Sequence, residues 1–166
     1  MSTKQELDST YMGVAILHSK LSKARRSQVG ACLVTAHGTL LAGTNGTPSG
    51  TSNECEDEIN GELVTKGSVI HAEKNCILLA AKEGVSCLGA TIYLSLSPCL
   101  QCAAMLKQAG IARVVYKDTY RDLTGVQYLM DNQVKVEKVY RDWETDRKST
   151  RLNSSHSAKS RMPSSA

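Results

Sequence analysis

The chain has 166 residues, of which 41% are hydrophobic, and this composition suits one ordinary domain with a packed core. Its formal charge of +4 lies within residues 146–166, so the charge-balanced first 145 residues argue against a basic nucleic-acid-binding face. No apolar run is long enough to cross a membrane and the polar N-terminus is not a signal peptide, so we expect a cytoplasmic protein whose six cysteines are reduced.

The first half of the chain predicts a helix, a hairpin and a long loop. Residues 28–35 and 39–44 are expected to be paired strands around a turn at 36–38. The polar stretch at residues 45–63 is expected to be a functional loop, because long loops in compact domains usually carry function. Before them, residues 5–22 show helical spacing of one set of side chains: Leu7, Tyr11, Val14, Ala15, His18 and Leu21.

The second half alternates helices and strands. Residues 71–84 predict a helix that ends at a glycine, and residues 98–110 a helix opened by a proline and closed by a glycine. Alternation of this kind after a hairpin predicts an α/β domain with a mixed sheet and helices on its faces. The remaining expected elements are strands at 90–96, 112–117 and 133–139 and a short helix at 124–132.

Residues 146–166 differ from the rest of the chain. They are rich in Ser and poor in hydrophobic residues, a composition typical of disorder. The segments "DRKSTRLNSSH" and "SRMPSSA" also resemble the translation of a common sequencing-library adapter. We interpret residues 146–166 as an assembly artefact, with a natural disordered tail as the alternative. The artefact interpretation implies that residues 1–145 lack their native C-terminus.

Two separated motifs carry the chemistry. "HAE" supplies His71 and Glu73, and "PCLQC" supplies Cys99 and Cys102. One histidine and two cysteines form a three-ligand set, which leaves the fourth zinc position open and is typical of catalytic sites. His-x-Glu followed by Pro-Cys-x-x-Cys is the signature of zinc deaminases. Taken alone, "HAE" is a common tripeptide and the cysteine pair could be a redox pair. Only the two motifs together predict a zinc-deaminase site.

The spacing within each motif assigns roles. Cys99 and Cys102, three residues apart at a helix start, share one helical face where the helix dipole favours thiolates. Glu73 is too close to His71 to be an equally good ligand. We expect Glu73 to take a proton from water and deliver it to the substrate.

Several segments resemble the deoxycytidylate (dCMP) deaminase family over about residues 8–140. They are "RRSQVGACLV", "TNGTPSG", "HAEKNCI", "GATIYLSLSPCLQCAAMLKQAGI" and "RVVYKDTYRD". The resemblance implies a three-layer α/β/α cytidine-deaminase-like fold with a mixed five-stranded sheet, within a domain of residues 1–145. It also implies zinc-dependent hydrolysis of dCMP to dUMP and ammonia, which feeds dTMP synthesis.

The resemblance also implies where substrate binds. Asn45 inherits a contact with the nucleoside, and Thr47 lies in a segment near the nucleotide phosphates. Ala72, which lies between His71 and Glu73 in the sequence, is also expected to contact the substrate. A phosphate must be met by cations or N–H donors, for which Arg26 and Arg121 are candidates. Tyr120 could stack on the base or sugar. Taken alone, the arginines could be surface residues, Tyr120 a core tyrosine and "NGTPSG" a plain turn.

Further implications concern cofactors and assembly. The resemblance implies one catalytic Zn²⁺, a homo-oligomer that is often a hexamer, and regulation by dCTP and dTTP with Mg²⁺, in a bacterial or virus-infected host cell. A second, structural zinc is not expected, because Cys32 and Cys55 lack well-placed histidine partners. The sequence departs from the family at Thr44, where a tyrosine is usual. The acidic run "ECEDE" is expected to be solvated.

Other readings of the motifs remain open. One is another branch of the superfamily that acts on tRNA adenosine, free cytidine, guanine or a riboflavin precursor. The tRNA branch would need a basic face, which the balanced first 145 residues do not offer. Another is a zinc-stabilised binding module without turnover, in which a fourth ligand would close the metal site and Glu73 would be dispensable.

Overall fold

The computed structural model describes residues 1–139, so the interpretation of residues 146–166 lies outside the described residues. Within that range no helix has the length and apolar character to span a bilayer. The helices are α1 (Lys4–Ser19), α2 (Ala72–Glu83), α3 (Leu100–Gln108) and α4 (Thr124–Asp131). The strands are β1 (Gly30–Val34), β2 (Leu40–Thr44), β3 (Glu56–Ile59), β4 (Glu62–Thr65), β5 (Thr91–Leu96), β6 (Arg113–Asp118) and β7 (Lys135–Lys138).

Five strands form the central sheet, in the order β2-β1-β5-β6-β7. β1 pairs antiparallel with both β2 and β5, whereas β5, β6 and β7 run parallel. A tight turn can join only antiparallel neighbours, and the parallel strands are joined through the helices α3 and α4. The predicted mixed five-stranded sheet is confirmed.

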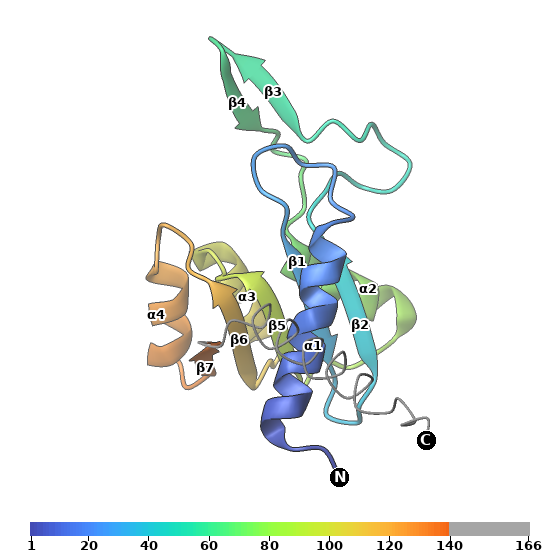
Figure 1. Ribbon diagram of the computed structural model, residues 1–166, viewed down its shortest axis with the longest axis vertical. Helices are drawn as coiled ribbons and strands as arrows, with labels where there is room; N and C mark the ends of the chain where they lie inside the picture. Colours follow the sequence, from blue (N-terminus) through green and yellow to red (C-terminus); the bar gives the residue numbers. More distant parts are fainter. Residues whose placement is uncertain (140–166) are drawn as a thin grey trace, which may run out of the picture.

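Helices cover both faces of this sheet, which gives the expected three layers (Figure 1). α1 packs on one face, where its Met12 and Ala15 meet Cys32, Tyr93 and Val115 of the sheet. α2, α3 and α4 cover the other face through a larger cluster of aliphatic side chains and cysteines. Because successive strand residues point to opposite faces and both faces are covered, β1 and β5 are buried on both sides.

The face that α1 buries is not the one that the sequence predicts. Met12 and Ala15 are buried, but Leu7 is 40% exposed and Leu21, beyond the helix end, is 61% exposed. The helix lies so close to β1 that a Cβ on Gly30 would be 1.8 Å from the Ala15 carbonyl oxygen. The close approach requires glycine at position 30, and Leu7 and Leu21 lie outside the contact.

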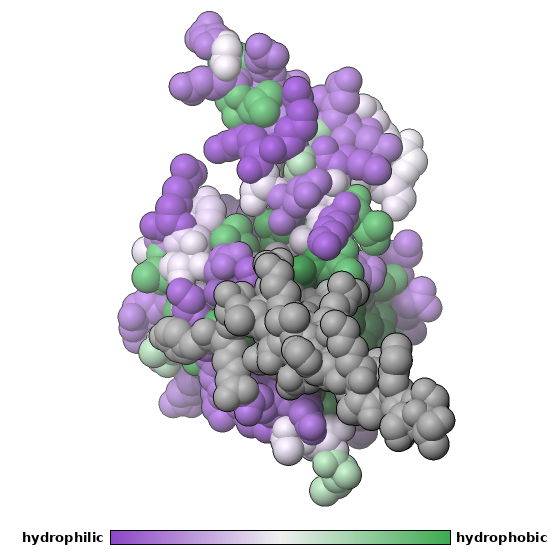
Figure 2. Space-filling view, viewed as in Figure 1, coloured by the Kyte–Doolittle hydropathy of each residue, from purple (hydrophilic) through white to green (hydrophobic). Residues whose placement is uncertain are grey.

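The prediction of a loop over residues 45–63 is wrong in the second half of that range, where β3 and β4 form a separate hairpin. Asn60 and Gly61 both have positive φ, as a tight hairpin turn requires. The hairpin projects from the body (Figure 1), and its visible surface is largely hydrophilic (Figure 2). The sequence analysis missed this hairpin because its strands are mostly polar and show little alternation of apolar and polar residues. The Asn-Gly pair between them is nevertheless a turn signal.

Candidate active site

The ends of two helices bring the three expected metal ligands together. His71 is the N-cap residue of α2, Cys99 is the N-cap residue of α3, and Cys102 lies in the first turn of α3. His71 Nδ1 lies 3.3 Å from Cys102 Sγ and 3.8 Å from Cys99 Sγ. Tetrahedral zinc with bonds of about 2.0 Å to N and about 2.3 Å to S separates its ligand atoms by about 3.5 Å. The set therefore fits a zinc ion.

The surroundings of Cys102 disfavour its thiolate as long as no cation is bound. Burial raises the pKa of the Cys102 thiol, and the nearby Glu73 carboxylate and Cys99 raise it further. Burial thus opposes the effect of the helix dipole that the sequence suggested. A divalent cation ligated by His71, Cys99 and Cys102 would lower the pKa of the Cys102 thiol again, because a coordinating thiol is deprotonated. Among residues 1–139, these are the His, Cys, Asp and Glu side chains grouped closely enough to hold a metal.

Glu73 occupies the second position of α2, two residues after His71, and is only 4% exposed. It lines the same cavity as His71 and Cys99, so a molecule bound beside the metal ligands would meet its carboxylate. A carboxylate shielded from bulk water next to an open metal position is suited to carry a proton between water and substrate.

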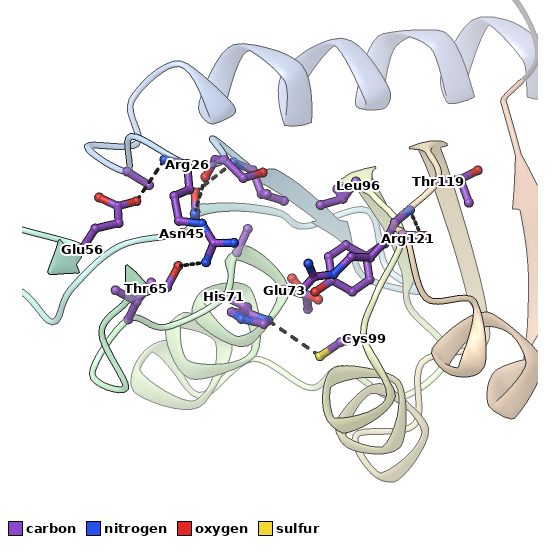
Figure 3. Close-up of a pocket in the computed structure, with 17 residues that line it drawn as sticks. Arg26, Asn45, Glu56, Thr65, His71, Glu73, Leu96, Cys99, Thr119 and Arg121 are labelled. Carbon is purple, nitrogen blue, oxygen red and sulfur yellow. Dashed lines mark hydrogen bonds between the residues drawn. The ribbon is translucent and has the colours of Figure 1, made fainter. Parts of the chain in front are cut away.

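A cavity of about 410 Å³ opens over this group, which is a size that accommodates a small organic ligand (Figure 3). Cys102 lies outside the cavity lining, and so does Thr47, which the resemblance placed near phosphate. The sequence-predicted residues that do line the cavity are Arg26, Asn45, His71, Ala72, Glu73, Cys99, Tyr120 and Arg121.

The side-chain amide of Asn45 is engaged with the backbone. Its Oδ1 accepts from the Val29 N–H at 2.9 Å, and its Nδ2 donates to the Ser27 carbonyl at 2.8 Å. Asn45 therefore holds the segment before β1 against the end of β2. A nucleoside contact, which remains a prediction, would use the second amide hydrogen or lone pair.

Two arginines reach the cavity from opposite sides (Figure 3). Arg26 donates through Nη1 to Thr65 Oγ1 at 3.2 Å. Arg121 lies with its guanidinium 5.6 Å from the Tyr120 ring centroid, a cation–π arrangement. Within the described part of the chain neither arginine forms an ion pair. Both are therefore available to an anionic ligand.

The sequence analysis missed several residues of the cavity wall. Ser97 is buried and its Oγ accepts from the Tyr120 N–H at 2.7 Å, which fixes the segment that carries Arg121. Glu56 is 5% exposed, so the expectation of a solvated acidic run is wrong at this position. Ser97 directly precedes the "PC" of the motif, whereas nothing local distinguishes Glu56 from its acidic neighbours.

Comparison with protein families agrees with this geometry. The family described as "Cytidine and deoxycytidylate deaminase zinc-binding region" matches residues 5–118. The probable deoxycytidylate deaminase of Drosophila melanogaster is 35% identical over 148 residues, which cover 73% of this chain and 70% of that protein. The deoxycytidylate deaminase of Homo sapiens is 37% identical over 122 residues, which cover 68% of this chain and 65% of that protein.

Solved structures give the same picture. The dCMP deaminase of the cyanophage S-TIM5, in complex with dCMP and dUMP, superposes on this chain with a TM-score of 0.77 at 38% sequence identity. The superposition covers 83% of this chain and 100% of the S-TIM5 chain. A structure from a study of tRNA:A34 deaminases, at 22% identity and a TM-score of 0.55, shares the fold alone.

Proposed function

The chain belongs to the cytidine and deoxycytidylate deaminase zinc-binding family, and from this membership we propose that it hydrolyses dCMP to dUMP and ammonia, a step that supplies dUMP for dTMP synthesis. One observation carries the proposal: His71, Cys99 and Glu73 share a cavity with two arginines that have no ion-pair partner among residues 1–139. The first group suits hydrolysis of an amino group, and the second suits an anionic substrate.

The chemistry divides between the metal and the protein. Zn²⁺ held by His71, Cys99 and Cys102 would supply Lewis-acid activation of water. Hydrolytic deamination replaces the C4 amino group of the base by oxygen, so both protons of the water must leave its oxygen, one for ring atom N3 and one for the amino group that leaves as ammonia. The Glu73 carboxylate accepts these protons in turn and returns the first to N3 and the second to the leaving amino group. Because Glu73 is buried, few bulk water molecules compete for these protons.

The cavity favours a nucleotide over a free nucleoside. The 5′-phosphate of a nucleotide would accept hydrogen bonds from the two arginines. Charge-assisted hydrogen bonds from guanidinium to phosphate are stronger than hydrogen bonds between neutral groups. The S-TIM5 enzyme bound to dCMP and dUMP supports the same substrate class. We assign Arg26 and Arg121 to the phosphate, Tyr120 to stacking, and Asn45 and Ala72 to the nucleoside.

The test compares substrates on the zinc-loaded protein. We expect kcat/KM for dCMP to exceed that for deoxycytidine by about tenfold or more, the effect of charge-assisted contacts to one phosphate. Equal values would mean that the arginines do not bind phosphate and would assign the chain to the nucleoside branch. Turnover of adenosine-bearing RNA in place of both would assign it to the tRNA branch.

Regulation, assembly and compartment belong to the same proposal. We propose a homo-oligomer that responds to dCTP and dTTP with Mg²⁺, as the family resemblance implies. Deoxycytidylate deaminases of Enterobacteria phage T4 and Mycobacterium phage D29, at 34% and 30% identity, support a role in a bacterial or virus-infected cell.

A further inference from the structure

The base of the β3–β4 hairpin forms part of the cavity wall. Glu56, the first residue of β3, and Thr65, the last residue of β4, are directly opposite each other in the hairpin register. Both line the cavity beside Arg26 (Figure 3). The projecting hairpin is therefore joined to the active site by its two base residues.

Glu56 holds the main chain around Arg26. Its Oε1 accepts from the backbone N–H groups of Arg25 at 2.9 Å and Arg26 at 3.1 Å. Its Oε2 lies 3.9 Å from Arg25 Nε, and the Glu56 side chain is only 2% exposed. A buried carboxylate is stable only when its oxygens have such partners, so this segment and the hairpin fix each other in position.

Thr65 holds the side chain of the same arginine. Its Oγ1 accepts from Arg26 Nη1 at 3.2 Å. This bond leaves the Nη2 and Nε groups of Arg26 to donate to another acceptor, so a phosphate could still be bound in bidentate fashion.

We propose that Glu56 and Thr65, here called the Arg26 clamp, are positioning residues through which the β3–β4 hairpin confers specificity for a substrate phosphate. The inference rests on the proposed function. A free arginine loses much rotamer freedom when it binds a ligand, and an arginine already held in place loses less. The clamp thus favours nucleotides over nucleosides by holding Arg26 in place.

A double-mutant cycle tests whether the clamp acts through Arg26. The zinc-loaded full chain is assayed on dCMP and deoxycytidine as wild type, Thr65→Val, Arg26→Ala and the double variant. We expect Thr65→Val to reduce the ratio of kcat/KM for dCMP over deoxycytidine by about three- to tenfold, the effect of one hydrogen bond. With Arg26 replaced by alanine, adding Thr65→Val should change the ratio no further.

Matched variants separate positioning from folding. Thr65→Ser keeps the hydroxyl and should restore the ratio. Glu56→Gln should lower the ratio, whereas Glu58→Gln, an exposed position on the same strand, should not. Zinc content and thermal unfolding identify any misfolded variant, and the exposed Thr65 series decides the question if Glu56→Gln does not fold.

Two outcomes would overturn the inference. If Thr65→Val lowers the ratio as much without Arg26 as with it, or does not lower it at all, the clamp is rejected and the substrate proposal stands. If the wild type itself shows no preference for dCMP, both the substrate proposal and the clamp are rejected.

Discussion

Glu73 and His71 lie two residues apart, and their positions fit the different roles that we propose for them. His71 stands at the N-cap of α2 and turns its Nδ1 toward the two cysteines, whereas Glu73 lies inside the first turn and faces the cavity. The helix start separates their side chains, so the histidine faces the cysteines while the carboxylate faces the cavity.

At this scale we predict that Glu73→Ala keeps zinc and loses turnover. Removal of the proton carrier should lower kcat by about 10²- to 10⁴-fold, the usual contribution of general acid–base catalysis. Zinc is measured with a chromogenic chelator after denaturation, beside the steady-state rate on dCMP. Loss of zinc in Glu73→Ala would make Glu73 a ligand or its support, and full turnover would reject its proton role.

Helix α4 matters at the scale of elements because it supports the turn that bears Cys99. A Cβ on Gly125, near the start of α4, would lie 2.2 Å from the Pro98 carbonyl oxygen and 2.8 Å from that of Cys99. Both atoms are backbone, so they cannot move aside as a flexible side chain would. The glycine thus lets α4 pack directly on the ligand turn.

We predict that Gly125→Ala weakens zinc binding and lowers the midpoint of thermal unfolding. In an exposed helix the same change would stabilise by about 1 kcal/mol through helix propensity, so steric displacement of the ligand turn must reverse the sign. Zinc affinity is measured by competition with a chelator. Gly67→Ala, at a position with open space around it, serves as the control. Wild-type affinity in Gly125→Ala would show that the ligand turn does not depend on this contact.

An ionic network ties the N-terminal helix to the far strands and so acts on the whole molecule. Arg113 donates to both oxygens of Asp8, with Nη2 to Oδ2 at 2.6 Å, and also to Glu137. Lys4 lies 2.9 Å from Glu137, and Tyr93 donates to Asp8 at 2.8 Å. The network joins α1 to β5, β6 and β7 on the face of the sheet that α1 covers.

Arg113, followed by Lys4, lowers the pKa of Glu137 to about 2 from a usual 4.5. A depressed carboxyl pKa stabilises the folded state above the unfolded pKa, and this contribution is lost as pH falls from about 4.5 toward 2. We predict that Glu137→Gln lowers the thermal midpoint by about 2–4 °C at pH 7, the scale of one partly buried ion pair. The difference from wild type should vanish near pH 2.

Calorimetry at a series of pH values, with chelator present throughout so that zinc loss does not contribute, measures this effect. Glu58→Gln is the exposed control. A difference that stays constant down to pH 2 would mean that Glu137 stabilises by packing and not by charge.

The sequence alone predicted most elements and the residues that the structure groups at the centre. The sheet, its helices, and the set of His71, Glu73, Cys99 and Cys102 follow from local periodicity and motif spacing, because those signals lie within one element or at its start. The specific roles proposed for these residues await the experiments above.

Only the tertiary structure decided how the cavity is walled. The burial of Glu56, its bonds to the Arg25 and Arg26 backbone, and the contact of Thr65 with Arg26 join segments about thirty or more positions apart in the chain. The engagement of Asn45 with the segment before β1 is of the same kind. Burial and partner choice at such positions depend on what the fold places opposite them, and neither propensity nor periodicity in a single sequence encodes that.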